Sequence, residues 1–102
     1  MKISLIVAAV LAMTSVSAWA STEEAMTKAG CMACHTVDKK LVGPAFKEIA
    51  AKYKGQDVTA KLMAKVRAGG SGTFGPIPMA PNPADKINDA DLKAAVELIL
   101  KS

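Results

Sequence analysis

Aromatic residues and cysteines are scarce in this 102-residue chain, and it has only one histidine. Trp, Tyr and Phe together make up 4% of the sequence, so few large side chains are available to fill a core. The two cysteines, Cys31 and Cys34, could form one disulfide at most, and its loop would be too short to constrain the unfolded chain much. This scarcity excludes a disulfide scaffold. A small domain with so thin a core needs another stabilising group, such as a large apolar cofactor.

The one long hydrophobic run lies at the N-terminus. Lys2 precedes an apolar stretch over residues 3–16, and Ala18-Trp19-Ala20 has the small-x-small pattern of a cleavage site. The stretch is too short to cross a bilayer, so we predict a secretory signal peptide over residues 1–20. An uncleaved anchor is the alternative. The mature chain is then a single domain, residues 21–102, in the periplasm and without stable membrane insertion.

Four segments of the mature chain have helical patterns, and none has a convincing strand pattern. Between Gly69 and Pro83, glycine and proline dominate, which excludes a helix and a central strand. We therefore expect an all-α domain of four short helices and one long irregular loop. The residues predicted to begin or end the helices are Ser21 with Glu24 as a capping box, Gly30, Pro44, Gly55, Asp57, Gly69 and Asn88.

Cys31-Met32-Ala33-Cys34-His35 has the C-x-x-C-H spacing of a c-type haem attachment site. Two thiols on one helical turn can each form a thioether with a haem vinyl group, and the next residue brings an imidazole to the iron. His35 is the only histidine, so no other imidazole can take this position. The motif predicts one covalently attached haem c with an iron bound by His35.

Three other interpretations of this motif compete with haem attachment. A thioredoxin-like redox pair would need a βαβ setting that the chain does not offer. A structural zinc site needs four ligands, and Cys31, Cys34 and His35 supply three. A simple disulfide is chemically possible, but it leaves the adjacent histidine and the thin core unexplained.

The second axial ligand of the iron is predicted to be Met79. Met26 and Met63 fall in helical patterns, where methionine usually fills a core. Met32 lies inside the attachment motif and cannot reach the opposite face of the same haem. Met79 instead lies in a proline-rich segment, residues 75–81, which can hold its thioether in a fixed place.

An iron bound by both His35 and Met79 has no open position for a substrate. Both ligands stay bound in both redox states, so the group is suited to transferring single electrons. We therefore expect an electron carrier and not an enzyme. The alternative is a haem enzyme or gas sensor, for example one resembling a peroxidase, if the Met79 ligand is labile.

The chain resembles the small bacterial class I cytochromes c, in particular the type that donates electrons to nitrite reductase and terminal oxidases. The resemblance covers residues 21–102 and implies the class I fold around one haem, in a monomer. It rests on three segments of this sequence, which are Gly30-Cys31-Met32-Ala33-Cys34-His35, Val42-Gly43-Pro44-Ala45 and Gly70-Ser71-Gly72-Thr73-Phe74-Gly75-Pro76-Ile77-Pro78-Met79-Ala80-Pro81-Asn82.

The resemblance also implies hydrogen bonds that orient the two axial ligands. The carbonyl of Pro44 is expected to accept the ring N–H of His35. Asn82 is expected to form a hydrogen bond near the sulfur of Met79. Ile77, in the same segment as Met79, is expected to lie against the haem.

The surroundings of the haem propionates depart from the family pattern. Lys65 stands where the family commonly has an arginine near a propionate, and Arg67 could share that role. Phe74 replaces a tryptophan whose indole N–H reaches a propionate, and phenylalanine has no donor. Leu98 most closely matches the position of a second family tryptophan. These changes bear on the reduction potential and leave the iron ligands unaffected.

Basic residues near the attachment motif suggest how partners dock. Lys28, Lys39 and Lys40 flank the motif, and we expect them to ring an apolar contact patch and to steer docking to acidic surfaces of redox partners. Those partners could belong to respiration, denitrification or photosynthesis. Nucleic acid is not an expected partner, because the formal net charge is only +4 and no binding motif is present.

Overall fold

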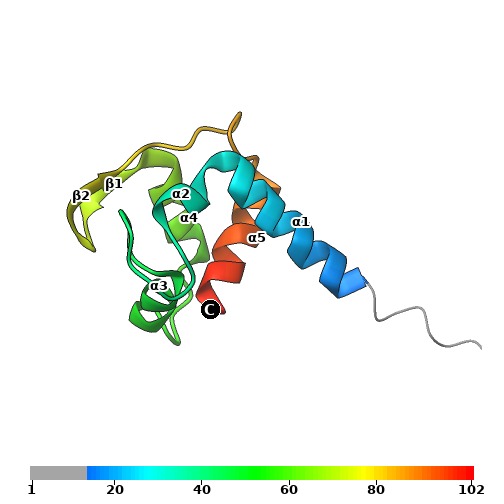
Figure 1. Ribbon diagram of the computed structural model, residues 1–102, viewed down its shortest axis with the longest axis horizontal. Helices are drawn as coiled ribbons and strands as arrows, with labels where there is room; N and C mark the ends of the chain where they lie inside the picture. The colour runs from blue at the N-terminus through cyan, green and yellow to red at the C-terminus, as the bar shows by residue number, and fades with distance from the viewer. Residues whose placement is uncertain (1–13) are drawn as a thin grey trace, which may run out of the picture.

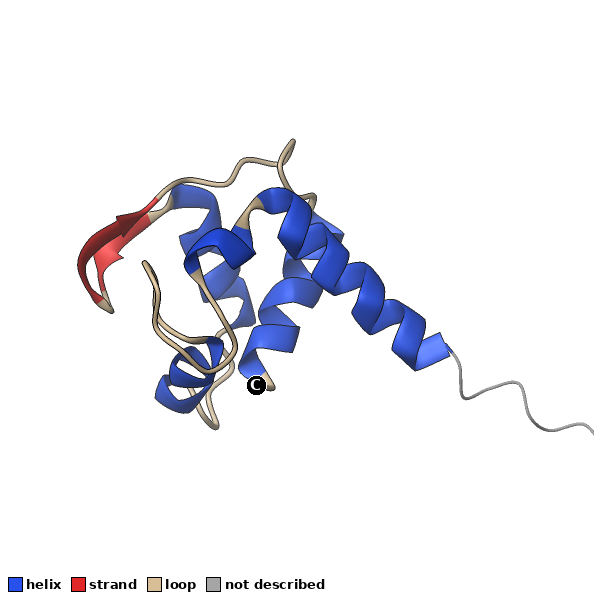
Figure 2. Ribbon diagram, in the orientation of Figure 1, coloured by secondary structure: helices blue, strands red, loops and turns tan. Residues whose placement is uncertain are grey.

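The computed structural model describes residues 14–102 of the chain. That part is mainly helical, with one small antiparallel sheet (Figures 1 and 2). The all-α class predicted from the sequence is confirmed, although residues 14–102 form five helices where four were expected. The elements are α1 (Thr14–Ala29), α2 (Cys31–Cys34), α3 (Phe46–Lys52), α4 (Thr59–Ala68), β1 (Gly70–Gly72), β2 (Gly75–Met79) and α5 (Asp89–Leu100).

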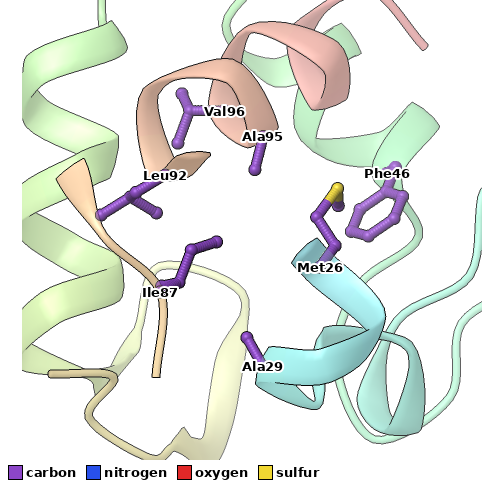
Figure 3. Close-up of a cluster of buried hydrophobic side chains, with 7 residues drawn as sticks. All are labelled: Met26, Ala29, Phe46, Ile87, Leu92, Ala95 and Val96. Atoms are coloured by element: carbon purple, nitrogen blue, oxygen red, sulfur yellow. The ribbon is translucent and has the colours of Figure 1, made fainter. Parts of the chain in front are cut away.

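Helix α5 is the centre of the packing, because it contacts α1, α3 and α4. Its Leu92, Ala95 and Val96 recur at helical spacing and are at most 3% exposed. Met26 of α1 is 1% exposed and packs in the same cluster, as Figure 3 shows. Met26 therefore fills the core, as its helical position predicts. The buried cluster consists of Met26, Ala29, Phe46, Ile87, Leu92, Ala95 and Val96.

Three of the four predicted helix starts, at Ser21, Pro44 and Asp57, differ from the structure. Ser21 lies inside α1, which begins at Thr14, so it caps nothing. The capping box is overridden because the residues before Ser21 continue the helix. Asp57 does not cap α4 either: Val58 is the N-cap residue, and no side chain accepts a hydrogen bond there.

The other predicted helix ends are closer to the structure. The Asn88 side chain accepts a hydrogen bond from the backbone N–H of Asp91 at 2.8 Å, which confirms it as the cap of α5. Gly30 and Gly69 follow the last residues of α1 and α4 with positive φ, as predicted. Gly55 also has positive φ, but it lies three residues beyond the end of α3 at Lys52. Pro44 is not the first helical residue of α3, which begins at Phe46.

The glycine- and proline-rich segment forms a two-stranded hairpin that the sequence analysis did not predict. β1 and β2 pair antiparallel, with Gly70 opposite Met79 and Gly72 opposite Gly75. Proline is tolerated here because each strand of a two-stranded ribbon leaves one edge unpaired, so a missing N–H costs nothing on that edge. The pairing places Met79 at the end of β2, next to the C-terminal end of α4.

The predicted signal peptide lies mostly outside the described residues. Residues 1–13 are not described, and residues 14–20 form the first part of α1. Between residues 14 and 102, no helix is both long and apolar enough to cross a bilayer.

Candidate haem site

The attachment motif forms a short helical turn that begins directly after α1. Gly30 has φ +90°, which lets the chain change direction between α1 and α2. Cys31 and Cys34 then lie on the single turn of α2. His35 leaves the turn with extended backbone angles while its N–H still bonds the carbonyl of Cys31 at 3.1 Å. Two thiols and an imidazole are thus presented from one compact element.

The His35 ring is held on several sides. Its Nδ1 donates to the carbonyl oxygen of Pro44 at 2.8 Å, the hydrogen bond that the resemblance implied. The ring stacks on Phe46 with centroids 5.4 Å apart, and the residue is 9% exposed. Gly43 packs so close that a Cβ there would lie 2.5 Å from the ring carbon Cε1. Because a carbonyl can only accept, the proton is on Nδ1 and the lone pair of Nε2 is available for a metal.

A largely apolar cavity of about 320 Å³ lies beside this ring. Its volume is in the range of cofactor pockets, which are lined mainly by apolar side chains with a few polar groups. The two cysteines and the histidine reach its wall from α2, and the methionine reaches it from β2. The cavity therefore suits a large apolar group that carries a metal. The predicted site residues on its wall are Cys31, Cys34, His35, Pro44, Lys65, Phe74, Ile77, Met79 and Asn82.

Arg67 is the one predicted site residue that does not line the cavity. Its Nη1 donates to the carbonyl oxygens of Asn82 and Ile87 at 3.0 and 2.7 Å. Its Nη2 lies 2.6 Å from Oδ1 of Asp89. The guanidinium is therefore bound to three oxygens outside the cavity, and the propionate role shared with Lys65 stays a prediction.

Asn82 bonds backbone carbonyls on both sides of the hairpin end. Its side-chain amide donates to the carbonyl oxygens of Ala80, the residue next to Met79, at 3.0 Å and of Val66 at 3.3 Å, and the expected hydrogen bond near the sulfur of Met79 stays a prediction. Its backbone N–H also bonds the carbonyl of Val66, at 3.1 Å. Asn82 is 8% exposed and thus fixes the chain three residues after Met79 to the end of α4.

A second cleft, of about 520 Å³, shares part of its lining with the cavity, including Lys65 and Tyr53. Lys52 and Lys61 also line it, and every charged residue on its wall is a lysine. Lys52 Nζ lies 5.8 Å from the ring centroid of Phe74. The sequence analysis missed Lys52 and Lys61, since lysines on an amphipathic helix give no signal beyond a solvated face.

The surroundings of the motif argue against two of the competing interpretations, the redox pair and the zinc site. Burial raises the pKa of the Cys31 thiol above its usual value, although a backbone hydrogen bond and the charge of Lys86 act in the opposite direction. A reactive redox cysteine needs the reverse shift. Between residues 14 and 102, no group of three or more His, Cys, Asp or Glu side chains is placed to hold a metal ion, so the zinc interpretation gains no support.

A helical domain with two thiols and an imidazole on one apolar cavity defines a c-type haem protein. Comparison with known proteins identifies the family: the cytochrome c family model matches residues 21–102, and the chain belongs to the cytochrome c family. It is 50% identical to cytochrome c2 of Rubrivivax gelatinosus over 84 residues, which cover 81% of this chain and 99% of the relative. It is 49% identical to cytochrome c-551 of Azotobacter vinelandii over 79 residues, covering 76% and 93%.

Solved structures agree with these sequence relatives. The crystal structure of cytochrome c552 from Nitrosomonas europaea matches with a TM-score of 0.70 and 45% identity, covering 78% of this chain and 96% of that one. The class I cytochrome c fold is thereby confirmed. The chain is a small monohaem electron carrier that exchanges electrons with redox partners and is not an enzyme. Its haem c is attached through Cys31 and Cys34.

Proposed function

We propose that this protein is a periplasmic electron carrier whose haem iron is bound by His35 and Met79. The observation that carries the proposal is that both side chains line one apolar cavity and come from different elements. The imidazole already donates Nδ1–H to Pro44, which leaves Nε2 for a metal. The predicted signal peptide over residues 1–20 supports the periplasmic location.

When bound, the haem supplies the one-electron chemistry, and the chain sets its conditions. A thioether ligand favours the ferrous state and raises the reduction potential. Apolar walls act in the same direction, because the ferric state carries more charge. Lys52, Lys61 and Lys65 add positive charge next to the cavity, which also disfavours the ferric state.

Replacing Met79 with alanine is expected to open the iron to external ligands. The wild-type holoprotein should show c-type absorption bands and no response to carbon monoxide, whereas Met79→Ala should lose the ferric iron–thioether band and bind carbon monoxide when reduced. Met63→Ala is the matched control, because Met63 packs against the core and does not line the cavity. Ready binding of carbon monoxide by the wild type would instead favour the enzyme or gas-sensor alternative.

The proposed docking face surrounds the mouth of the cavity. Val42 and Ile77 line the cavity and are also 51% and 56% exposed, so an apolar surface continues outward from the haem site. Lys28 forms an ion pair with Glu24 at 3.4 Å, which offsets part of its charge. Lys39 and Lys40 are therefore the main candidates for steering acidic partners. The exposed large apolar residues after position 30 are Met32, Val37, Leu41, Val42 and Ile77.

The double substitution Lys39→Glu/Lys40→Glu is expected to slow electron transfer to an acidic acceptor, such as a periplasmic nitrite reductase. At low ionic strength the bimolecular rate should fall about tenfold or more, and the difference should shrink as salt is added. The control Lys93→Glu/Lys101→Glu changes the net charge equally on α5 and the adjoining C-terminus. An equal fall for both double variants, or a rate that salt does not change, would contradict a docking face at Lys39 and Lys40.

A further inference from the structure

Arg67, on the last turn of α4, connects that helix to the segment that follows Met79. We call residues 80–88, which join β2 to α5, the strap. Nη1 of Arg67 bonds the carbonyls of Asn82 and Ile87, one near each end of the strap. Nη2 pairs with Asp89, the first residue of α5. One guanidinium therefore fixes the whole span between the methionine and the last helix.

The same end of α4 holds the chain on the other side of Met79. β1 follows α4 directly, and Gly70 pairs with Met79 across the hairpin. Asn82 in turn donates from its backbone N–H and its side chain to the carbonyl of Val66. Met79 itself is thus held by strand pairing, and the residues that follow it are held by the strap. Both connections lead to the C-terminal end of α4.

Arginine is suited to this arrangement because its planar fork can serve several acceptors at once. Asn82 and Ile87 are 8% and 5% exposed, so their carbonyls lie in a region with little water to replace the lost partner. A buried acceptor left without a donor is destabilising. The Arg67 side chain is 24% exposed, whereas that of Asp89 is 88% exposed, so the two carbonyl bonds, and not the ion pair, should matter most.

We propose that Arg67 is a positioning residue for Met79, acting through the strap to keep the thioether against the iron. This inference rests on the proposed ligation by Met79. It assigns Arg67 the role of retaining the axial ligand, a role different from the propionate contact expected from the sequence. Loosening the strap should then let Met79 leave the iron more often without unfolding the protein.

Imidazole binding to the ferric holoprotein tests this, because imidazole must displace Met79. Arg67→Met keeps an unbranched apolar stem and removes the donors, and it should raise the imidazole affinity about tenfold or more, the effect of one lost hydrogen bond from a charged donor. Arg67→Lys keeps the charge but not the fork, and it should give an intermediate increase. Asp89→Asn breaks only the exposed pair and should have little effect.

Leu98→Ala is the control for a general loss of stability, because Leu98 packs against the core and does not line the cavity. If Arg67→Met raises the imidazole affinity no more than Leu98→Ala does at an equal loss in free energy of unfolding, Arg67 is merely structural and the inference is wrong. Where Arg67→Met yields no holoprotein, Arg67→Lys carries the same comparison.

Met79→Ala separates this inference from the proposed function. It gives the affinity expected when no thioether competes. If Met79→Ala binds imidazole no tighter than the wild type, then Met79 is not a ligand and the proposed function fails. If Met79→Ala binds tighter and the Arg67 variants do not, only the role of Arg67 fails.

Discussion

Replacing Gly43 with alanine is expected to push the His35 imidazole out of place. The added Cβ would lie 2.5 Å from Cε1 and 2.9 Å from Nδ1 of the ring. The ring has little freedom to yield, since it stacks on Phe46 and its Nδ1 is bonded to Pro44. Overpacking of this kind costs about 1–3 kcal/mol, which should appear as a lower free energy of unfolding of the holoprotein.

The reduction potential should change as well. The hydrogen bond from Nδ1 to the Pro44 carbonyl makes the imidazole a better electron donor, which favours the ferric state. If Gly43→Ala weakens that bond, the potential should rise. Gly55→Ala is the control, because Gly55 has φ +77° and open space around it, so it should cost about 1–2 kcal/mol without moving the potential. An unchanged potential and stability in Gly43→Ala would show that the ring has room to move.

Local sequence signals predicted the parts of the fold that depend on neighbouring residues. The C-x-x-C-H turn needs only Cys31 to His35, and the Asn88 cap needs only the next three residues. Gly30 and Gly69 end their helices because positive φ is a property of a single residue. In each of these cases a few adjacent residues decide the conformation.

Contacts between distant residues could not be predicted in the same way. Arg67 bonds residues 15, 20 and 22 positions away, and nothing near it in the sequence indicates those acceptors. Lys52 lies beside Phe74 only because α3 and the hairpin region meet in the fold. Its placement is a property of the tertiary structure, which is why the sequence did not predict a role for Lys52.

The family resemblance was most informative for hydrogen bonds within a short stretch of chain, and least informative for the direction of long flexible side chains. It implied the His35–Pro44 hydrogen bond, which a short stretch of chain forms. It did not assign a role to Gly43 within the same segment, although the ring contact is steric and local. The propionate role suggested for Arg67 depends on where a long side chain points, and the resemblance gave no sign of the three oxygens that its guanidinium bonds.

Gly69→Ala is expected to disturb Met79 more than any neighbouring glycine substitution. Gly69 has φ +70° and ψ −159°, angles that are open almost only to glycine, and forcing another residue there costs about 1–3 kcal/mol. The added Cβ would also collide with the carbonyl oxygen of Met79, and it would lie 2.9 Å from the backbone of Ala80 and Pro81. The ferric iron–thioether band should therefore weaken or disappear, and the imidazole affinity should rise.

Gly70 provides the matched comparison for this prediction. Its φ is +119°, yet a Cβ there would meet nothing within 4 Å. Gly70→Ala therefore carries backbone strain of a similar kind without the collision, and it should keep the thioether band. If both variants lose the band equally, hairpin strain alone controls the ligand. Both glycines have positive φ, and they differ mainly in the atoms that surround them. If only Gly69→Ala loses the band, close packing between the end of α4 and the Met79 backbone is what keeps the sulfur on the iron.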